Sequence, residues 1–434
     1  MKIAVIGGGT AGFVAAAHLS KYFPTFDLYH IYDPNIPIIG VGEGTTAIFR
    51  DWLQELTGLS DLELVEQCFM TRKYGIKFEN WGTQHQSFFH HFCPLREEYA
   101  YHLSSEEIVK LLDRYVSATS IHKKVIALES DGMVAKIEFS DRTHLDVDFA
   151  IDARGLPKTL GDEHIKVNII PTNAALLRQC PAIPGGIVDL KINGHPFEYN
   201  SATRAIARPH GWIFMIPLTH RTSYGYIYNH LITSIEDVTQ DFDIFLDSEG
   251  VTSVAKERQL TFPNFTCRSF FDGAVFRIGN TASFLEPLEA TAIVWILVFM
   301  RSLSVWPLRQ LVFKHTKPKL KPDNLQRFNQ ILFNHLMRTA LFIGWHYSMG
   351  SRFESEFWKF AQSNYQTELK KFDHPQLLNE FEQFCQLGQN LPHPLTQHQE
   401  FVAAAAQQCE DQDINFSMFT TSGFAEMGYG IGYF

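Results

Sequence analysis

The chain has 434 residues, 45% of them hydrophobic and 19% charged, so it is long enough to bury a large core and form two or three lobes. Its formal net charge of −10 and the lack of a long basic run argue against a nucleic-acid partner. The apolar run Ala292–Met300 is too short to span a bilayer, the chain opens on a strand instead of a signal peptide, and the six scattered cysteines are typical of reduced thiols. We therefore expect a cytoplasmic protein with no membrane partner.

The first elements predict a dinucleotide-binding unit. Lys2–Ile6 has the composition of a buried strand, Ala11–Tyr22 has the periodicity of a helix, and Phe26–Tyr32 follows as a second strand. Residues 7–12, between the first strand and the helix, read Gly-Gly-Gly-Thr-Ala-Gly and match the spacing G-x-G-x-x-G. A glycine motif in this position, directly after a strand and before a helix, is typical of nucleotide-binding folds.

Each residue of the glycine motif has an expected role. Gly7 allows the tight turn, Gly9 lets the backbone approach a pyrophosphate, and Gly12 permits close packing of helix on strand. Thr10 and Ala11 begin the helix, whose outward amide groups would hold the phosphates.

Two features follow the motif. A ribose-binding acid is expected about 20 residues further on, and Asp33 stands at that distance, with a solvated strand-end aspartate as the alternative. Residues 39–45 read Ile-Gly-Val-Gly-Glu-Gly-Thr, for which the plain interpretation is a glycine-rich turn before a helix at Ala47.

The next segment contains a helix and a predicted meander. Ser104 and Glu107 have capping-box spacing at the start of a helix that runs to about Val116. His90-His91 has no further ligand at metal spacing, so we expect no metal site and interpret the pair as structural or substrate-lining. Three alternating segments then predict the strands of the meander, His122–Leu128, Met133–Phe139 and His144–Ile151.

A short aromatic strand lies inside the β-rich stretch Pro171–Ile232. Residues 211–217 read Gly-Trp-Ile-Phe-Met-Ile-Pro, and their apolar residues on both faces predict a fully buried strand. Pro217 ends this strand, because proline cannot donate a ladder hydrogen bond. On the residues alone, an aromatic core strand is a sufficient explanation.

The rest of the chain becomes helical. A short strand at Ala274–Ile278 precedes a helix from about Glu289 to Ser302. Apolar residues at intervals of three and four then predict a helix between Leu325 and Ile343, with Asp323 as its N-cap. Two further helices are expected near Arg352–Lys371 and Pro375–Leu387, and a tail of weak periodicity follows Pro392. We predict an α/β fold with a box over residues 1–310, including a β-rich insertion, and a mainly helical lobe over residues 311–434.

Several blocks resemble the flavin-dependent halogenases, of the tryptophan halogenase type. The strand at 211–217 resembles the family's Trp-x-Trp-x-Ile-Pro signature, with Phe214 at the second Trp. In this resemblance Trp212, Phe214, Ile216 and Pro217 form a wall between flavin and substrate. Such a wall would suppress hydroxylation, which is the reaction of related monooxygenases. Phe214 keeps the wall apolar and would leave a wider tunnel.

Two other blocks supply the chemistry that the resemblance implies. Residues 72–81 resemble Lys-x-Gly-Ile-x-Phe-x-Asn-Trp, in which Lys73 matches the catalytic lysine; the alternative is a surface charge. Residues 279–293 resemble the second flavin motif and the segment Glu-Ser-Thr-Gly, in which Glu289 matches the catalytic glutamate. Thr291 and Ala292 match the residues that supply backbone amides to halide.

This second block departs from the family pattern at two positions. Ala290 replaces Ser and removes a hydroxyl, whereas Ala292 replaces Gly and would disturb the halide loop if that position required a positive φ. A third block, Trp345-His346-Tyr347 with Arg352 and Phe357-Trp358, resembles the family's helical lobe, and we interpret it as packing.

The resemblance also implies the cofactor. It places Val41, Gly42, Glu43, Gly279 and Ile293 against FAD, in a Rossmann-type box like that of glutathione reductase, with an added β-sheet and the C-terminal helical lobe. The family's ribose acid would fall at Tyr32 and not at Asp33. With one dinucleotide fingerprint in the chain and none for NAD(P)H, FADH2 is expected from a separate flavin reductase.

The predicted function is halogenation of an electron-rich, indole-like arene by FADH2, O2 and halide, through hypohalous acid held in the protein. Lys73 would activate the hypohalous acid, and Glu289 would accept the proton or stabilise the cationic intermediate. Chloride, bromide and iodide all remain open, a broader arene than free tryptophan is expected, and a homo-oligomer is compatible with the sequence. The alternatives are an FAD-dependent aromatic monooxygenase and a non-catalytic flavin-binding protein.

Overall fold

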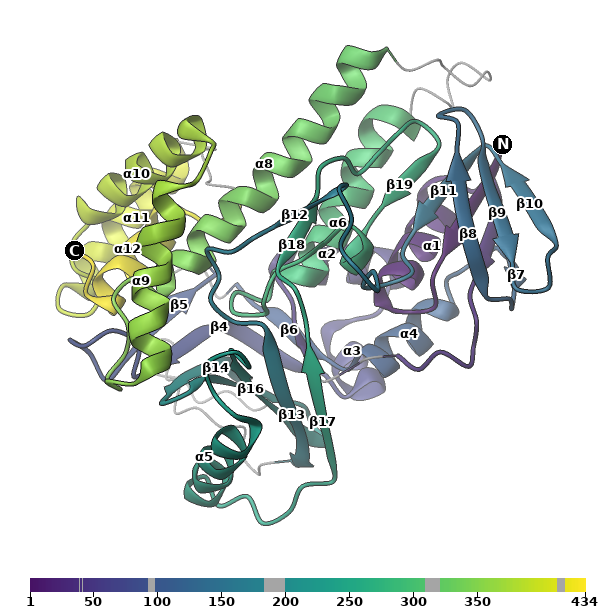
Figure 1. Cartoon of the computed structure of the whole chain (residues 1–434). Coiled ribbons are helices and arrows are strands. Elements are labelled where there is room, and N and C mark those ends of the chain that lie inside the picture. Colours follow the sequence, from purple (N-terminus) through teal and green to yellow (C-terminus); the bar gives the residue numbers. More distant parts are fainter. Residues whose placement is uncertain (39, 41, 93–97, 183–199, 309–320, 412–417) are drawn as a thin grey trace.

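The computed structural model describes the whole chain except residues 39, 41, 93–97, 183–199, 309–320 and 412–417 (Figure 1). The nucleotide-type sheet stands at one end of the molecule, a second large sheet fills the middle, and helices α9–α12 gather at the other end, with the long helix α8 running toward them across the middle (Figure 1). The predicted mixed α/β architecture is therefore confirmed. The boundary predicted between residues 310 and 311 lies outside the described residues, so that division stays a prediction.

The predicted dinucleotide unit is present as a parallel sheet. In the described residues this sheet has the strand order β19-β11-β1-β2-β7, with β1 in the centre. Helix α1 follows β1 and buries its alanine-rich face, because residues 13–17 are almost fully excluded from solvent. The bounds are β1 Lys2–Ile6, α1 Thr10–Tyr22, β2 Asp27–Ile31, β7 Thr119–Ile121, β11 Phe149–Asp152 and β19 Val275–Arg277.

The meander is confirmed, but its third predicted strand is wrong in length. The strands are β8 Val125–Ser130, β9 Ala135–Phe139 and β10 His144–Val147, and β10 stops at Val147 instead of continuing to Ile151. Asp148 separates it from β11, because the backbone and carboxylate of Asp148 both bind the backbone of Lys2, at 3.0 and 2.9 Å. These contacts redirect the chain into the parallel sheet.

The central sheet carries most of the candidate site. Its strands follow the order β17-β13-β16-β15-β14-β4-β6-β3, and β5 pairs with β4. The predicted aromatic strand is β15, Gly211–Pro217, which is buried along its whole length between β14 and β16. The remaining bounds are β3 Glu43–Gly44, β4 Thr71–Glu79, β5 Ser87–His91, β6 Ala100–Leu103, β13 Ala174–Pro181, β14 Asn200–Arg208, β16 Arg221–Tyr228 and β17 Lys256–Thr261. A small sheet contains β12 His164–Lys166, β18 Phe265–Cys267 and β20 Ser283–Phe284.

The predicted helices are present, and the tail contains two more. The weakly periodic tail beyond Pro392 forms α11 and α12, of which α12 packs against β5 and α10. Tertiary packing therefore stabilises α12, although the sequence of the tail has no clear amphipathic pattern. The helices are α2 Ala47–Thr57, α3 Asp61–Cys68, α4 Ser105–Asp113, α5 Ile235–Ser248, α6 Thr291–Leu303, α8 Pro322–His346, α9 Glu356–Lys370, α10 Pro375–Gln389, α11 His398–Asp411 and α12 Thr421–Ile431, with the shorter turns η1 Gly279–Thr281 and η2 Ser304–Leu308.

Two predicted helix starts are wrong in detail. Ser104 is the N-cap of α4, but its side chain makes no capping hydrogen bond, and Glu107 pairs with Lys110 instead. In α8 the N-cap is Lys321, and Asp323 lies within the first turn, because Pro322 takes the first helical position.

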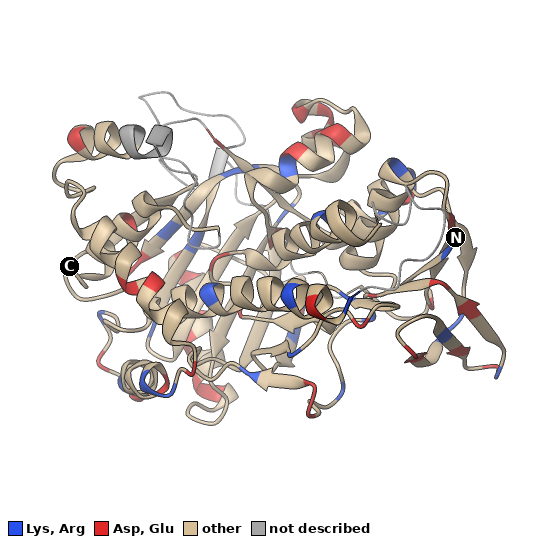
Figure 2. Ribbon diagram, turned by 90° about the horizontal axis from the view of Figure 1, so that it is seen from above, with Lys and Arg blue, Asp and Glu red and all other residues tan. Residues whose placement is uncertain are grey.

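One helical segment passes the length and composition test for a membrane span. Thr291–Leu308 has 18 residues and a mean hydropathy of 1.6, and 61% of it is buried inside the protein. It exceeds the apolar run Ala292–Met300 because the helical turn η2 continues α6. The segment packs against α1 and α2, as a core helix of the box does. Figure 2 shows acidic and basic residues interspersed along the described elements.

Candidate functional site

The glycine loop after β1 has the geometry of a phosphate-binding turn. A Cβ at Gly7, where φ is +143°, would lie 2.3 Å from the carbonyl oxygen of Ala153, and one at Gly12 would lie 2.0 Å from the Gly7 oxygen. Both positions therefore require glycine. Gly9 is different, because a Cβ there would meet nothing within 4 Å. Gly9 is also the N-cap of α1, and as a glycine it has no side chain to cap the first amides of the helix. The backbone amides of Thr10 and Ala11 therefore lie at an uncapped helix N-terminus, which suits a pyrophosphate.

Asp33 lies just beyond the end of β2, where a ribose-binding acid is expected. Its Oδ1 accepts hydrogen bonds from the backbone and side-chain nitrogens of Asn35, both at 3.0 Å. The carboxylate thus closes its own turn, and its contact with a ribose remains a prediction. The neighbouring Tyr32 ring covers Gly8, where a Cβ would lie 3.0 Å from the ring.

The second glycine segment joins three parts of the site. A Cβ at Gly42 would lie 3.3 Å from Ile216 of β15, and one at Gly44 would lie 3.1 Å from Lys73 Nζ and 3.0 Å from Ala290 Cβ. The segment therefore runs between the aromatic strand, the lysine and the start of α6. Side chains at positions 42 and 44 would therefore press against these neighbours, and the φ of +92° at Gly42 also favours glycine.

Other members of the predicted flavin set lie around this segment. The Glu43 carboxylate accepts a hydrogen bond from Ser105 Oγ, whereas Val41 lies outside the described residues. Gly279 has φ +57° and packs on Ala11 of the first motif. Ile293 is buried in the first turn of α6.

Lys73 is buried and not a surface charge. Its side chain is fully excluded from solvent on β4, and Nζ lies 3.5 Å from the carbonyl oxygen of Thr45 and 5.0 Å from the centre of the Phe92 ring. Burial lowers the pKa of Lys73 to about 8, although the negative charge of Glu289 opposes this shift. An ammonium group with so few partners is poised to donate a hydrogen bond to a small ligand.

Glu289 is held by two histidines. Its Oε1 lies 2.7 Å from His346 Nε2 on α8 and 3.2 Å from His90 Nδ1 on β5, and all three side chains are buried. Burial alone would raise the pKa of Glu289, but the charges and hydrogen bonds of His90 and His346 outweigh burial and lower the pKa to about 2. Both of these hydrogen bonds reach Oε1, and no hydrogen bond from the described residues is seen at Oε2.

The position of His346 corrects the interpretation of its block as packing. His346 Nδ1 lies 2.7 Å from the carbonyl oxygen of Phe342, and its Nε2 faces Glu289. Both ring nitrogens thus face acceptors, and His346 is held between the backbone of its own helix and the carboxylate of Glu289. Trp345 and Trp358 do pack as predicted, against Phe424 and against Tyr347.

The His90-His91 pair has two carboxylate partners. His91 binds Glu426 of α12 through its backbone N–H, at 2.9 Å, and through Nδ1, at 2.5 Å. His90 binds Glu289 and also packs on Gly423 of α12, where a Cβ would lie 2.8 Å from its Nε2. Within the described residues no group of three or more His, Cys, Asp or Glu side chains could hold a metal ion.

The aromatic strand β15 separates two sides of the central sheet. Trp212, Phe214 and Ile216 join the main core, whereas Ile213 and Met215 join a second cluster under α5. The Trp212 ring lies 6.2 Å from that of Trp81 and 6.4 Å from that of Phe214. Pro217 ends the strand as predicted, and its carbonyl oxygen accepts a hydrogen bond from Thr71, two residues before Lys73.

The start of α6 shows which of the two departing alanines, Ala290 or Ala292, has a positive φ. Ala290 is the N-cap and has φ +54°, while Thr291 and Ala292 are the first two residues of the helix. The positive φ therefore falls at Ala290 and not at Ala292, so the substitution at 292 causes no strain. Ala290 carries the strain instead, because a left-handed conformation disfavours residues with a Cβ.

Sequence reasoning missed Glu286, which lies in the same loop. It is fully buried, its Oε1 accepts a hydrogen bond of 2.7 Å from Tyr347, and its Oε2 accepts one from Thr172. Burial raises the pKa of Glu286 to about 7, against the opposing effect of these hydroxyl groups. The available signal was a charged residue between Leu285 and Pro287-Leu288, in the stretch that joins the predicted strand Ala274–Ile278 to the following helix.

A nucleotide-type sheet beside a buried lysine, a histidine-held carboxylate and an aromatic strand is the architecture of a flavin-dependent enzyme. The family model "Tryptophan halogenase" matches residues 2–98 and 95–393. The chain therefore belongs to the tryptophan halogenase family, whose members are flavin-dependent enzymes.

Individual relatives agree over most of their length. Tryptophan 7-halogenase RebH of Lentzea aerocolonigenes is 23% identical over 428 residues, covering 82% of this chain and 78% of the relative. The tryptophan 2-halogenase of Chondromyces crocatus is 23% identical, covering 83% of this chain and 70% of the relative. The solved structure of BrvH, a flavin-dependent halogenase from Brevundimonas sp. BAL3, has the same fold, with a TM-score of 0.74, 20% identity, and coverage of 99% of this chain and 90% of that one.

Proposed function

We propose that the protein halogenates an electron-rich, indole-type arene with reduced FAD, O2 and halide. The observation that supports this proposal most is that Lys73, the aromatic strand and Ala290 meet around one glycine segment, with the charge of Glu289, next to Ala290, acting on Lys73. Reduced FAD, when bound, would supply with O2 the two-electron oxidation that converts halide to hypohalous acid. Every other step falls to side chains of this chain.

The proposed cofactor site is built from the two glycine segments and the second flavin motif. The amides at the start of α1 would hold the pyrophosphate, and Gly42, Glu43, Gly279 and Ile293 would surround the remainder. Asp33 is the candidate for the ribose. These residues fit FAD because Gly9 stands open where phosphates must approach, and a side chain there would block them.

Lys73 is the proposed donor to hypohalous acid. With a pKa lowered to about 8 by burial, Lys73 is mainly an ammonium at neutral pH, so it can donate a hydrogen bond that makes the halogen more electrophilic. Close to pH 8 the neutral amine becomes available, and its attack on the halogen of hypohalous acid would form an N–X bond, break the O–X bond and release water.

Glu289 is the proposed partner of the arene. Its low pKa, set by His90 and His346, keeps it anionic, and an anion stabilises the cationic intermediate of aromatic substitution. That intermediate is a strong acid, so even a weakly basic carboxylate oxygen such as Oε2 can accept its proton. His346 and His90 are positioning residues in this proposal.

Two further elements complete the proposed site. The amides of Thr291 and Ala292 at the open start of α6 would bind the halide. Trp212, Phe214, Ile216 and Pro217 would keep the arene away from the flavin, so that hypohalous acid and not the flavin reaches it. A separate flavin reductase is the proposed source of reduced FAD, a cytoplasmic location the proposed setting, and a homo-oligomer stays open.

The test compares two lysines of the same strand. Protein, FAD, a flavin reductase, NADH, bromide and indole are incubated, and the products are identified by mass spectrometry. Lys73→Ala should reduce brominated indole by at least about 100-fold while FAD binding, measured by fluorescence, stays unchanged. Lys77→Ala is the matched control, because Lys77 lies on β4 but is one-third exposed and faces Glu79 at 3.8 Å.

Each outcome decides between the candidate functions. Brominated indole from wild type and Lys77→Ala, but not from Lys73→Ala, supports the proposal. Hydroxylated indole would identify a monooxygenase. Bound FAD without any product, across several arenes and halides, would indicate a flavin-binding protein.

A further inference from the structure

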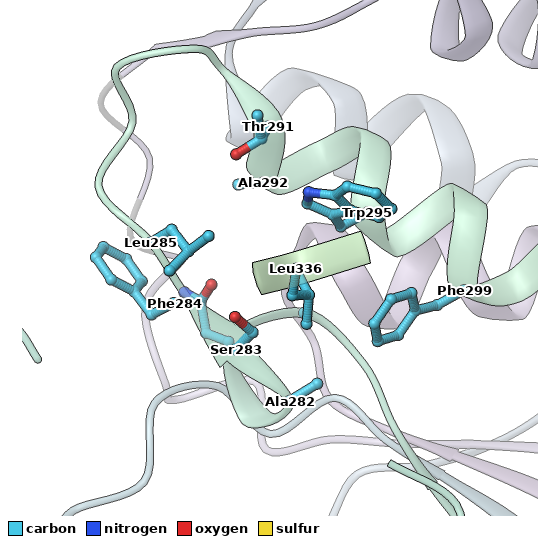
Figure 3. A pocket seen from close by; sticks show the side chains of 11 residues that line it. Ala282, Ser283, Phe284, Leu285, Thr291, Ala292, Trp295, Phe299 and Leu336 are labelled. Atoms are coloured by element: carbon cyan, nitrogen blue, oxygen red, sulfur yellow. The ribbon is translucent and has the colours of Figure 1, made fainter. Parts of the chain in front are cut away.

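A small cavity lies beside the start of α6. Its volume is about 30 Å³, which exceeds the roughly 10–15 Å³ that one water needs and is far below what an aromatic ring needs. Figure 3 shows residues of α6, of α8 and of β20 with its flanking residues converging on it. The lining residues are Gly279, Asn280, Ala282, Ser283, Phe284, Leu285, Thr291, Ala292, Trp295, Phe299 and Leu336.

Trp295 contributes a buried donor that lacks an acceptor. The residue is 8% exposed, and no group in the described residues accepts a hydrogen bond from its Nε1. Leaving such a donor unsatisfied costs about 1–3 kcal/mol, so a ligand that accepts this hydrogen bond is favoured.

Helical geometry aims this donor at the first turn of α6. Trp295 follows Ala292 by three residues and Thr291 by four, which places the three on one face of the helix. Helical side chains also lean toward the N-terminus. Figure 3 shows the indole nitrogen on the side of Ala292 and Thr291.

The start of α6 adds positive potential to the same space. Its N-cap Ala290 makes no side-chain hydrogen bond, so that cap satisfies none of the first-turn amides. Amides of this kind and the helix dipole favour an anion. The indole N–H and the helix start are therefore two independent features that suit the same charge.

The rest of the lining selects the kind of anion. No lysine or arginine lines the cavity, which is unfavourable for phosphate or sulfate, and Leu285, Phe299 and Leu336 make the walls largely apolar. An apolar wall penalises strongly hydrated ions most. A single weakly hydrated halide fits both the volume and the lining.

We propose that this cavity binds a halide ion, bromide in preference to chloride, and that Trp295 Nε1–H is its side-chain donor. The inference rests on the proposed function, which places halide at the backbone amides of Thr291 and Ala292. The new element is the Trp295 indole, which would donate a further hydrogen bond to the same halide. Trp295 thereby becomes a residue that determines halide preference.

The experiment measures halide binding directly, without turnover. Line broadening of the ³⁵Cl resonance is followed with the full chain, with and without oxidised FAD, and bromide is titrated as the competitor. We expect saturable broadening in wild type, and about tenfold or more weaker bromide binding in Trp295→Phe, because one donor to an anion is lost. Trp345→Phe is the matched control, since Trp345 Nε1 is also buried without an acceptor in the described residues but lies outside the cavity.

The outcomes separate this inference from the proposed function. Equal bromide affinity in wild type and Trp295→Phe, or no saturable binding by wild type, overturns the inference even if the enzyme halogenates indole. Bromide binding that depends on Trp295 in a protein that halogenates nothing leaves the inference standing and removes the function.

A second measurement needs no substitution in the tested protein. The chain has seven tryptophans, so ¹⁵N-indole labelling gives seven side-chain resonances, and comparison with Trp295→Phe assigns one of them. Bromide should shift the Trp295 resonance most. A resonance that does not move while others do would contradict the proposed contact.

Discussion

Glu286 and Glu289 lie three residues apart in one loop, and both are buried, yet their pKa values move in opposite directions. The pKa of Glu289 is lowered to about 2, whereas that of Glu286 is raised to about 7. Glu289 faces two imidazoles, from His90 and His346, whereas Glu286 faces uncharged donors, the hydroxyl groups of Thr172 and Tyr347 and the indole of Trp212.

The difference shows that charge on the partner, and not burial, decides which carboxyl group is an anion. Burial acts on both residues in the same direction, and hydroxyl groups compensate for it only in part. Two carboxyl groups whose pKa values are shifted in opposite directions can take different roles within one site. In this protein the charge of Glu289 acts on the buried Lys73, whereas Glu286, whose pKa is about 7, anchors the loop through Tyr347 and Thr172.

The largest effect on this contrast is expected when Glu289 loses its negative charge but keeps its size. Glu289→Gln keeps the size and a hydrogen-bonding amide but loses the charge that would stabilise the cationic intermediate, so halogenation should fall by about 100-fold or more. Product formation under excess reductase measures the change. Glu286→Gln, the companion variant three residues away, should lose less than about fivefold; equal losses would remove the distinction between the two carboxyl groups.

The second test replaces one of the two imidazoles that face Glu289. His346→Gln keeps a side-chain N–H near Glu289 but cannot carry a proton, so the pKa of Glu289 should rise toward its ordinary value. We expect the acid limb of the kcat/KM profile to move up by at least about one unit, with slower turnover near that limb. An unchanged profile would show that His346 does not set the ionisation of Glu289.

The third test concerns Glu286 and the pH dependence of the free energy of unfolding. Because burial raises the pKa of Glu286 from 4.5 to about 7, this group makes the free energy of unfolding fall as pH rises through that window, and has no further effect above it. The expected fall is about 3 kcal/mol. Denaturant titrations of Glu286→Gln between pH 4.5 and 7.5 should lack this contribution, and a curve parallel to wild type would contradict it.

The smallest expected effect is at Phe214. Its ring fills the space over Gly225, where a Cβ would lie 2.2 Å from the ring, so a larger indole must displace neighbours toward the substrate side. Phe214→Trp should change the ratio of brominated to chlorinated product, or of two competing arenes, by a fewfold. FAD affinity should stay constant, and an unaltered product ratio would argue against the role of Phe214 in the wall.

Local patterns in the sequence were sufficient for the parts of the site that are local. The glycine motif at residues 7–12 and the buried strand at 211–217 were predictable because turn geometry and alternation act over a few residues. The partners of Glu289 were not, because His90 and His346 lie 199 and 57 residues away and no periodicity connects them. The positive φ of Ala290 also had no sequence signal, since alanine rarely adopts it.

Helix α12 has a consequence for the order in which the molecule assembles. His91 is bound by Glu426, 335 residues later in the chain, and Gly423 of the same helix covers His90. During synthesis, the two histidines of β5 therefore stay uncovered until residues 421–431 have been made and docked on β5. A chain interrupted before this helix would hold the parallel sheet of residues 2–277 complete, but would leave His90, a partner of Glu289, without its cover.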